Sequence, residues 1–167
     1  MNISSTFHSP ETTADAEAIY RESKHPIYLG GGQELVLRLQ HDLEHVSDLI
    51  DLSNINGLHG IYAEGPTLSI GACENHAAVA GSAVVAQKVP VLSELASNIG
   101  DSQTRNRGTI GGAIASKTRS SDWNAALLAL EAMIHTTKNS HMAEDYFAKG
   151  GLTEGELITK ICFEIPS

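Results

Sequence analysis

Two glycine-rich stretches contain the residues best suited to hold a ligand. In the first, Gly30, Gly31 and Gly32 follow a short apolar run, 27–29, and precede an expected helix over 33–40. Adjacent glycines are costly in backbone entropy, so such a run persists where side chains must be absent. One such place is where backbone N–H groups close on a phosphate. Taken alone, this stretch is explained equally well as a tight connection between a strand and a helix.

The second stretch, 103–115, is more informative. Thr109 offers a hydroxyl group, and Gly111 and Gly112 permit the close approach of the backbone to a ligand. Asp122, shortly after it, can accept a hydrogen bond from a ribose or ribityl hydroxyl. Arg105 and Arg107 in this stretch are more simply explained as solvated charges or as salt-bridge partners of the acidic surface. Together, the two stretches predict that they face one another across one dinucleotide.

The standard nucleotide-binding motifs are absent. A Rossmann turn requires Gly-x-Gly-x-x-Gly, but no glycine follows Gly32 until Gly57. A Walker A loop requires Gly-Lys-Ser/Thr, which does not occur. We find no catalytic triad, carboxylate pair or histidine metal motif in the sequence. The predicted ligand is therefore held by the protein backbone in some other fold.

Composition limits the possible partners. The chain has 167 residues and a formal net charge of -9, which argues against nucleic-acid binding. The same charge implies that a phosphate is held by backbone dipoles rather than by a lysine cluster. No apolar run approaches the roughly 20 residues that span a bilayer, and the first residues lack a secretory pattern. Cys73 and Cys162 have no disulfide-framework spacing, so we expect a cytoplasmic protein.

The pattern of apolar residues predicts an α+β fold with two parts. Up to about residue 54 we expect a small α/β unit with parallel strands, formed by a helix over 9–23, a strand over 27–29, a helix over 33–40 and a strand over 45–52. From about 55 we expect an antiparallel sheet with helices, formed by a hairpin over 58–63 and 67–71, helices over 74–81, 83–87, 91–99 and 123–130, and strands over 133–137 and 158–165.

Two segments of the second part show little periodicity. We expect 100–121 to be a long loop, either functional or disordered, and 138–155 to be peripheral. Trp123 and Cys73 are expected to be buried. The whole chain, 1–167, is predicted to be one domain with subdomains of about 1–54 and 55–167.

An ordered set of short motifs resembles the FAD-binding domain of the molybdenum hydroxylases, as in the flavin subunit of carbon monoxide dehydrogenase and the flavin domain of xanthine dehydrogenase. The resemblance covers nearly the whole chain, although each motif alone is weak. It is carried by Gly30-Gly31-Gly32-Gln33-Glu34-Leu35, Ile50-Asp51-Leu52, Ile70-Gly71-Ala72, the stretch from Gln103 to Gly112, Asp122 before an apolar helix, Gly155-Glu156-Leu157-Ile158, and Ile165-Pro166.

The resemblance implies a two-subdomain, PCMH-type FAD-binding fold with non-covalent FAD between the subdomains. It implies that both glycine stretches hold the pyrophosphate, that Asp122 contacts the sugar, that Ile99 lies near the flavin and that Leu157 or Ile158 covers the ring. The implied cofactor-binding residues are Leu29, Gly30, Gly31, Gly32, Gln33, Glu34, Leu35, Ile99, Thr109, Ile110, Gly111, Gly112, Ala113, Asp122, Leu157 and Ile158. The implied function is to relay electrons from an iron–sulfur subunit to an acceptor, beside a molybdenum-cofactor subunit.

Departures from the family pattern keep two other functions open. Gln33 stands where the family has threonine, Ala113 where it often has asparagine, and the chain ends near where the family's C-terminal domain begins. A flavin-free homologue that acts as a binding or assembly module is one alternative, and a free-standing flavin reductase is another. If the pyrophosphate site is placed correctly, we expect Gly111→Val to abolish flavin retention in a protein that remains folded.

Overall fold

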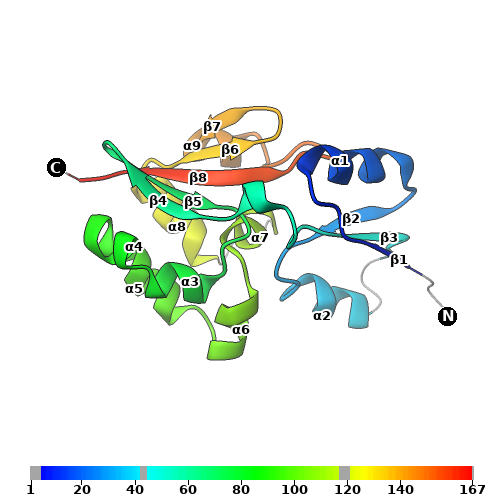
Figure 1. Cartoon of the computed structure of the whole chain (residues 1–167), viewed down its shortest axis with the longest axis horizontal. Helices are drawn as coiled ribbons and strands as arrows, with labels where there is room; N and C mark the ends of the chain where they lie inside the picture. Colours follow the sequence, from blue (N-terminus) through cyan, green and yellow to red (C-terminus); the bar gives the residue numbers. More distant parts are fainter. Residues whose placement is uncertain (1–4, 42–44, 117–120, 167) are drawn as a thin grey trace.

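The structure is a computed structural model that describes residues 5–41, 45–116 and 121–166 (Figure 1). It is an α+β protein with one parallel and one antiparallel sheet, as the sequence predicts. The parallel sheet lies at the N-terminal side of the molecule, and the antiparallel sheet extends away from it towards the C-terminus (Figure 1).

The N-terminal sheet has three strands in the order β1-β3-β2, all parallel. They are β1 (Thr6–His8), β2 (Pro26–Leu29) and β3 (Asp48–Asp51), accompanied by helices α1 (Thr13–Glu22) and α2 (Leu35–Gln40). The sequence did not predict β1. Helix α1 also begins later than predicted, because the hydroxyl of Thr12 caps it by accepting a hydrogen bond from the Asp15 amide at 3.1 Å.

The second sheet has five antiparallel strands in the order β4-β5-β8-β6-β7. The strands are β4 (Ile61–Glu64), β5 (Thr67–Gly71), β6 (Met133–Thr136), β7 (Ser140–Met142) and β8 (Ile158–Glu164). Ile161 of β8 pairs with Ile70 on one side and Ile134 on the other, and all three are fully buried. This row of isoleucines forms the centre of the larger core.

Seven helices of the described chain belong to the second part. They are α3 (His76–Gly81), α4 (Ala83–Lys88), α5 (Pro90–Asn98), α6 (Ser102–Arg107), α7 (Ile110–Ala115), α8 (Asp122–Ala129) and α9 (Ala143–Ala148), and the 3-10 turn Asn56–Leu58 precedes them. Helices α3, α4 and α5 lie on one side of the sheet (Figure 1). Trp123 on α8 is 1% exposed, which confirms its expected place in the core.

The two parts share a second, smaller core. Ala16, Ile50 and Leu52 come from the N-terminal part, while Leu58, Cys73 and Leu157 come from the second part. The expected burial of Cys73 is confirmed, and burial raises the pKa of its thiol to about 12.

Two expectations about irregular segments are wrong. The segment 100–121 contains α6 and α7, whose first turns are capped by the side chains of Asp101 and Thr109. The segment 138–155 contains β7 and α9, and Tyr146 of α9 is 3% exposed. Helix α6 contains no apolar residue and α7 contains two glycines, so neither shows a helical apolar period, and such short helices depend on tertiary contacts.

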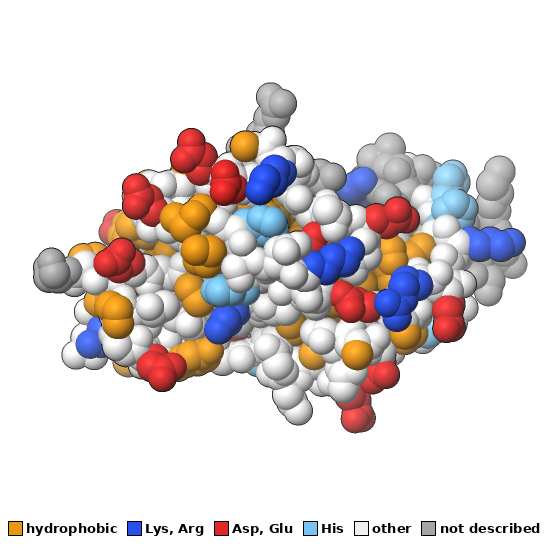
Figure 2. All heavy atoms as spheres, turned by 90° about the horizontal axis from the view of Figure 1, so that it is seen from above, with side chains coloured by type: hydrophobic (Ala, Val, Ile, Leu, Met, Phe, Trp, Pro, Cys, Tyr) orange, Lys and Arg blue, Asp and Glu red, His pale blue; other side chains and the backbone are white. Residues whose placement is uncertain are grey.

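Charges of both signs are interspersed on the face that Figure 2 shows, and the described residues of that face form no continuous basic stripe. Among the described helices, none has the length and apolar character required to cross a membrane.

The row of isoleucines leads to a test of the core. Ile161→Ala removes a fully buried side chain, so we expect the free energy of unfolding to fall by about 2–5 kcal/mol. Val91→Ala, at a side chain that is 51% exposed, is the control and should change it by less than about 0.5 kcal/mol. Urea denaturation measures both; equal effects would contradict this description of the core.

Candidate functional site

The two glycine stretches meet where the two parts of the chain join. A Cβ atom at Gly31 would lie 1.9 Å from the carbonyl oxygen of Arg107 and 2.7 Å from the Cα atom of Gly108. A Cβ at Gly30 would lie 2.9 Å from the hydroxyl oxygen of Thr109. The two stretches therefore lie directly against one another, and a dinucleotide held between them stays a prediction. We call this contact of residues 30–31 with residues 107–109 the glycine junction.

The backbone amides of the first stretch are available to a ligand. Among the hydrogen bonds of the described residues, none uses the N–H groups of Gly30, Gly31, Gly32 or Gln33. Gly32 has a φ of 74°, which favours glycine, and its carbonyl oxygen accepts from the Val36 amide at 3.0 Å to start α2. The loop thus has a defined path while its donors are unused.

The amides of the second stretch are already hydrogen-bonded within the protein. The Ile110 amide donates to the Glu74 carbonyl oxygen at 3.0 Å, and the Gly111 amide donates to the Ala72 carbonyl oxygen at 2.8 Å. The Gly112 and Ala113 amides donate to the hydroxyl and carbonyl oxygens of Thr109, at 3.1 Å and 3.0 Å. These bonds anchor the stretch to the start of α3, so its backbone forms a fixed wall.

The sequence analysis missed two further residues that hold the second stretch in place, Asn75 and His76. Asn75 forms an isolated antiparallel bridge with Thr109, and His76 is buried beside Gly108. The only local signal is that Asn75 caps α3 by accepting a hydrogen bond from the Ala78 amide at 2.7 Å. That signal predicts a helix start but not a contact with a loop more than thirty residues later.

The remaining predicted residues lie in different environments. Gln33, Glu34 and Asp122 are exposed, while Leu29, Leu35 and Ile99 are partly buried. Leu157 belongs to the smaller core and Ile158 to the larger one, and they are 3% and 5% exposed. Neither of these two side chains lies open at the surface, so their burial gives no support to a role in covering the flavin ring.

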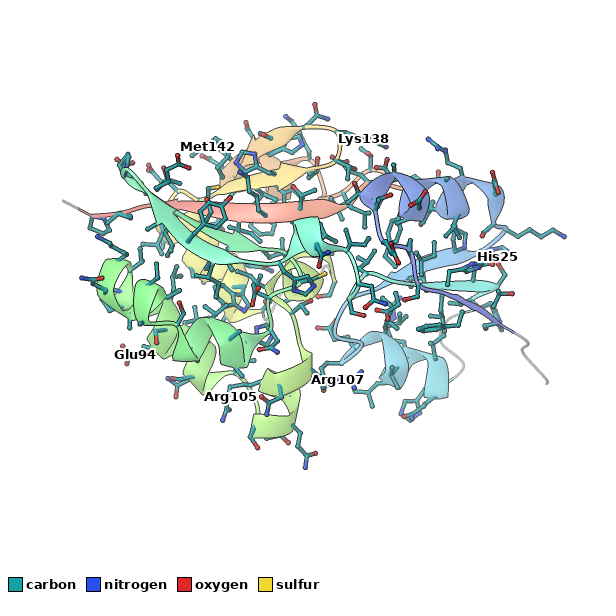
Figure 3. The ribbon with its side chains drawn as sticks, in the orientation of Figure 1. His25, Glu94, Arg105, Arg107, Lys138 and Met142 are labelled. Atoms are coloured by element: carbon teal, nitrogen blue, oxygen red, sulfur yellow. The ribbon has the colours of Figure 1, made fainter. Side chains whose placement is uncertain are left out.

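The two arginines of α6 differ in their surroundings. Arg105 donates from Nη1 to the carbonyl oxygens of Ile99 and Gly100, at 3.0 Å and 2.8 Å, so it closes the end of α5. This contact with backbone carbonyl groups differs from both expected environments, a solvated charge and a salt bridge to the acidic surface. Arg107 is exposed and lies on the side of α6 nearer α2 (Figure 3).

The comparisons with known proteins decide the family. Residues 2–167 match the family described as "FAD binding domain in molybdopterin dehydrogenase". The chain belongs to this family. It is an FAD-binding domain of the molybdopterin dehydrogenase type, as the motifs of the sequence indicated.

Relatives of the FAD-binding domain are subunits of oxidoreductases. The carbon monoxide dehydrogenase medium chain of Afipia carboxidovorans is 34% identical over 170 residues, which cover 96% of this chain and 58% of the relative. The 6-hydroxypseudooxynicotine dehydrogenase complex subunit alpha of Paenarthrobacter nicotinovorans is 39% identical over 106 residues, which cover 64% of this chain and 36% of the relative.

Solved structures show the same arrangement of the FAD-binding domain. Quinoline 2-oxidoreductase from Pseudomonas putida 86 matches with a TM-score of 0.93 at 26% identity, over all of this chain and 61% of that chain. Carbon monoxide dehydrogenase from Hydrogenophaga pseudoflava matches with a TM-score of 0.91 at 30% identity, over 98% of this chain and 60% of that chain. This chain spans less than two thirds of the length of each of these relatives.

The residues of the glycine junction fit the pyrophosphate of FAD. Four unused backbone N–H groups lie in one loop, 30–33, whose three glycines carry no side chain of their own. Neutral amide donors suit a phosphate in a chain whose net charge is -9. The FAD-binding domain therefore offers a set of donors of the right chemistry at the junction of its two parts.

The packing of Gly111 changes one expectation about this site. A Cβ there would lie 2.7 Å from both the Cβ and the carbonyl oxygen of Ala72. The expectation that Gly111→Val remains folded stays a prediction, but the variant must also lose stability, since even a methyl group would require the backbone of the FAD-binding domain to shift.

This packing can be tested without any ligand. We expect Gly111→Ala to lower the free energy of unfolding by about 1–3 kcal/mol. The matched control is Gly81→Ala, where a Cβ would meet nothing within 4 Å and the change should stay below about 1 kcal/mol. Urea denaturation of the FAD-free protein compares them. Equal stability of the two variants would show that residue 111 is not packed as described.

Proposed function

We propose that this chain holds FAD in a molybdenum-hydroxylase-type oxidoreductase and that it relays electrons from an iron–sulfur partner to an acceptor. When bound, FAD supplies the electron-accepting chemistry, and the protein binds, orients and shields it. The observation that carries this proposal is the glycine junction, where unused amide donors lie against a fixed wall of backbone.

We assign different tasks to the two glycine stretches. The amides of Gly30, Gly31, Gly32 and Gln33 would donate to the pyrophosphate, because they have no acceptor among the described residues. The stretch from Thr109 to Ala113 would limit where the pyrophosphate can lie, since its own amides donate within the protein. This assignment supports the predicted position of FAD but shifts most of the hydrogen bonding to the first stretch.

The other predicted contacts remain part of the proposal. Asp122 is exposed in the first turn of α8, where its carboxylate can accept a hydrogen bond from a sugar hydroxyl. Ile99 is partly buried at the end of α5 and would lie near the flavin. Leu157 and Ile158 would contribute by supporting the two cores rather than by side-chain contact.

We further propose that the chain functions in the cytoplasm, within a hetero-oligomer that contains an iron–sulfur subunit and a molybdenum-cofactor subunit. The support is that relatives are named as a medium chain or as a subunit of a dehydrogenase complex. Affinity purification of the tagged chain from its native host, with metal analysis of what co-purifies, tests this. Co-purification of iron and molybdenum is expected, and their absence from a stable complex would argue against these partners.

Uptake of FAD separates the proposed function from its alternatives. The purified chain should show flavin absorbance, either as isolated or after incubation with FAD and gel filtration. No uptake would favour the flavin-free assembly module. Rapid NADH oxidation by the FAD-loaded chain alone would instead favour a free-standing flavin reductase.

The first glycine stretch provides a sharper test. Gln33→Pro removes one unused N–H donor two positions before α2 begins at Leu35. We expect it to weaken FAD binding about tenfold, since a hydrogen bond to a charged group stabilises by about 1.5–3 kcal/mol. Gln33→Ala keeps the amide and should bind FAD as the wild type does.

Isothermal titration calorimetry with FAD measures both variants, and circular dichroism confirms that each is folded. Equal FAD affinity for Gln33→Pro and Gln33→Ala would show that the amide of residue 33 does not bind FAD. Loss of affinity in both variants would assign the contact to the glutamine side chain instead.

A further inference from the structure

A buried pair of aromatic side chains lies directly behind the second glycine stretch. The indole Nε1 of Trp123, on α8, donates a hydrogen bond to Nδ1 of His76, on α3, at 3.2 Å. The ring centroids are 6.0 Å apart with an interplanar angle of 28°, and the residues are only 1% and 4% exposed. Because Nδ1 accepts, His76 is neutral and carries its proton on Nε2.

His76 also touches the backbone of the glycine junction. Its amide donates to the carbonyl oxygen of Gly108 at 3.0 Å. A Cβ at Gly108 would lie 2.9 Å from Nε2 and 3.0 Å from Cδ2 of the imidazole. The ring therefore packs against the residue that precedes Thr109, on the stretch that meets Gly30 and Gly31.

The pair connects two elements that the proposed function assigns to FAD. His76 supports the backbone at Gly108, and Trp123 directly follows Asp122 in α8. A change in the hydrogen bond between the two rings would alter both the wall of the glycine junction and the start of α8.

We propose that His76 is a positioning residue for FAD. By accepting the hydrogen bond of Trp123, it fixes the backbone of Gly108 and Thr109 against the first glycine stretch and so sets the width of the cofactor site. This inference rests on the proposed function, because it assumes that FAD binds at the glycine junction.

Protonation of His76 is incompatible with this arrangement, because an imidazolium has no acceptor nitrogen for the indole N–H. Burial lowers the pKa of His76 from 6.5 to about 4, and no charged group contributes to this shift. Charged residues surround this part of the chain in three places. Glu74 is close to His76 in sequence, and Asp122 precedes Trp123. The helices that pack against α3 carry Lys88, Glu94, Arg105 and Arg107.

The direction of the pH dependence follows from this lowered pKa. The unfolded chain binds a proton at His76 below about pH 6.5, while the folded chain resists it until about pH 4. The stability that neutral His76 provides is therefore complete above pH 6.5 and is lost as the pH falls towards 4. The FAD affinity of the folded protein should fall only near pH 4, because the wall of the site loosens when His76 of the folded chain takes up its proton.

The first experiment uses FAD-free protein and needs no assumption about the cofactor. Trp123 is the only tryptophan, so the intrinsic tryptophan fluorescence reports on its surroundings. An imidazolium quenches a neighbouring indole, so wild-type emission should fall with a midpoint near pH 4. His76→Asn offers Oδ1 as an acceptor in place of Nδ1 and does not titrate, so its emission should stay constant over the same range.

The second experiment measures FAD affinity by calorimetry at pH 7.5 and then at decreasing pH. His76→Leu leaves the Trp123 N–H without an acceptor and should weaken binding about tenfold at pH 7.5. His76→Asn should bind as the wild type does at pH 7.5 and should keep FAD at acid pH, where the wild type releases it. Circular dichroism at each pH separates local loosening from global unfolding.

Specific results would overturn the inference. If His76→Leu binds FAD as tightly as the wild type, or if His76→Asn releases FAD at the same pH as the wild type, His76 does not position the cofactor. If wild-type emission does not titrate, the two rings are not coupled. If the wild type takes up no FAD at any pH, the proposed function fails, while the fluorescence titration still decides the coupling of His76 to Trp123.

Discussion

The structure depends on a place where two backbones approach more closely than side chains would allow. Gly31 lies against the carbonyl oxygen of Arg107 and the Cα atom of Gly108, so the first strand–helix turn and the end of α6 are in direct contact. Any side chain at residue 31 would separate the parts of the chain that carry them. The absence of a Cβ atom at Gly31 is therefore what allows the two parts of the chain to meet at the glycine junction.

A second contact holds the same two parts together at another position. The hydroxyl of Tyr28 donates to the carbonyl oxygen of Gly155 at 3.1 Å, and Tyr20 stacks on Tyr28 with centroids 4.7 Å apart. Gly155 has a φ of 71° and lies beside the ring of Tyr20. With Leu157 in the smaller core, this contact fixes the N-terminal sheet against the loop before β8. The two parts are thus held together by this additional packing as well as by the few contacts of the glycine junction itself.

The division of hydrogen bonding between the two glycine stretches suits an acidic protein that binds a phosphate. One loop keeps its amides free, and the other uses its amides to anchor itself to Ala72 and Glu74. The free amide donors of the first loop attract a phosphate without a cluster of positive side chains. Because the second loop is anchored, the site needs little reorganisation when a ligand binds. His76 and Trp123 extend the anchoring into the core, where the cost of an unsatisfied N–H group is high.

The sequence by itself determined the fold class, both glycine stretches, the parallel pairing of the first strands and the hairpin at Gly65-Pro66, because each has a local signal in composition or period. It did not predict α6, α7 or α9: α6 has no apolar residue, α7 contains two glycines, and the burial of Tyr146 on α9 depends on distant parts of the chain. Nor could it show which amides are free, because the acceptors for Ile110 and Gly111 come from residues 74 and 72, more than thirty positions away. The tertiary structure decided that point, and with it the place of His76, because hydrogen-bond partners are fixed only when distant segments pack together.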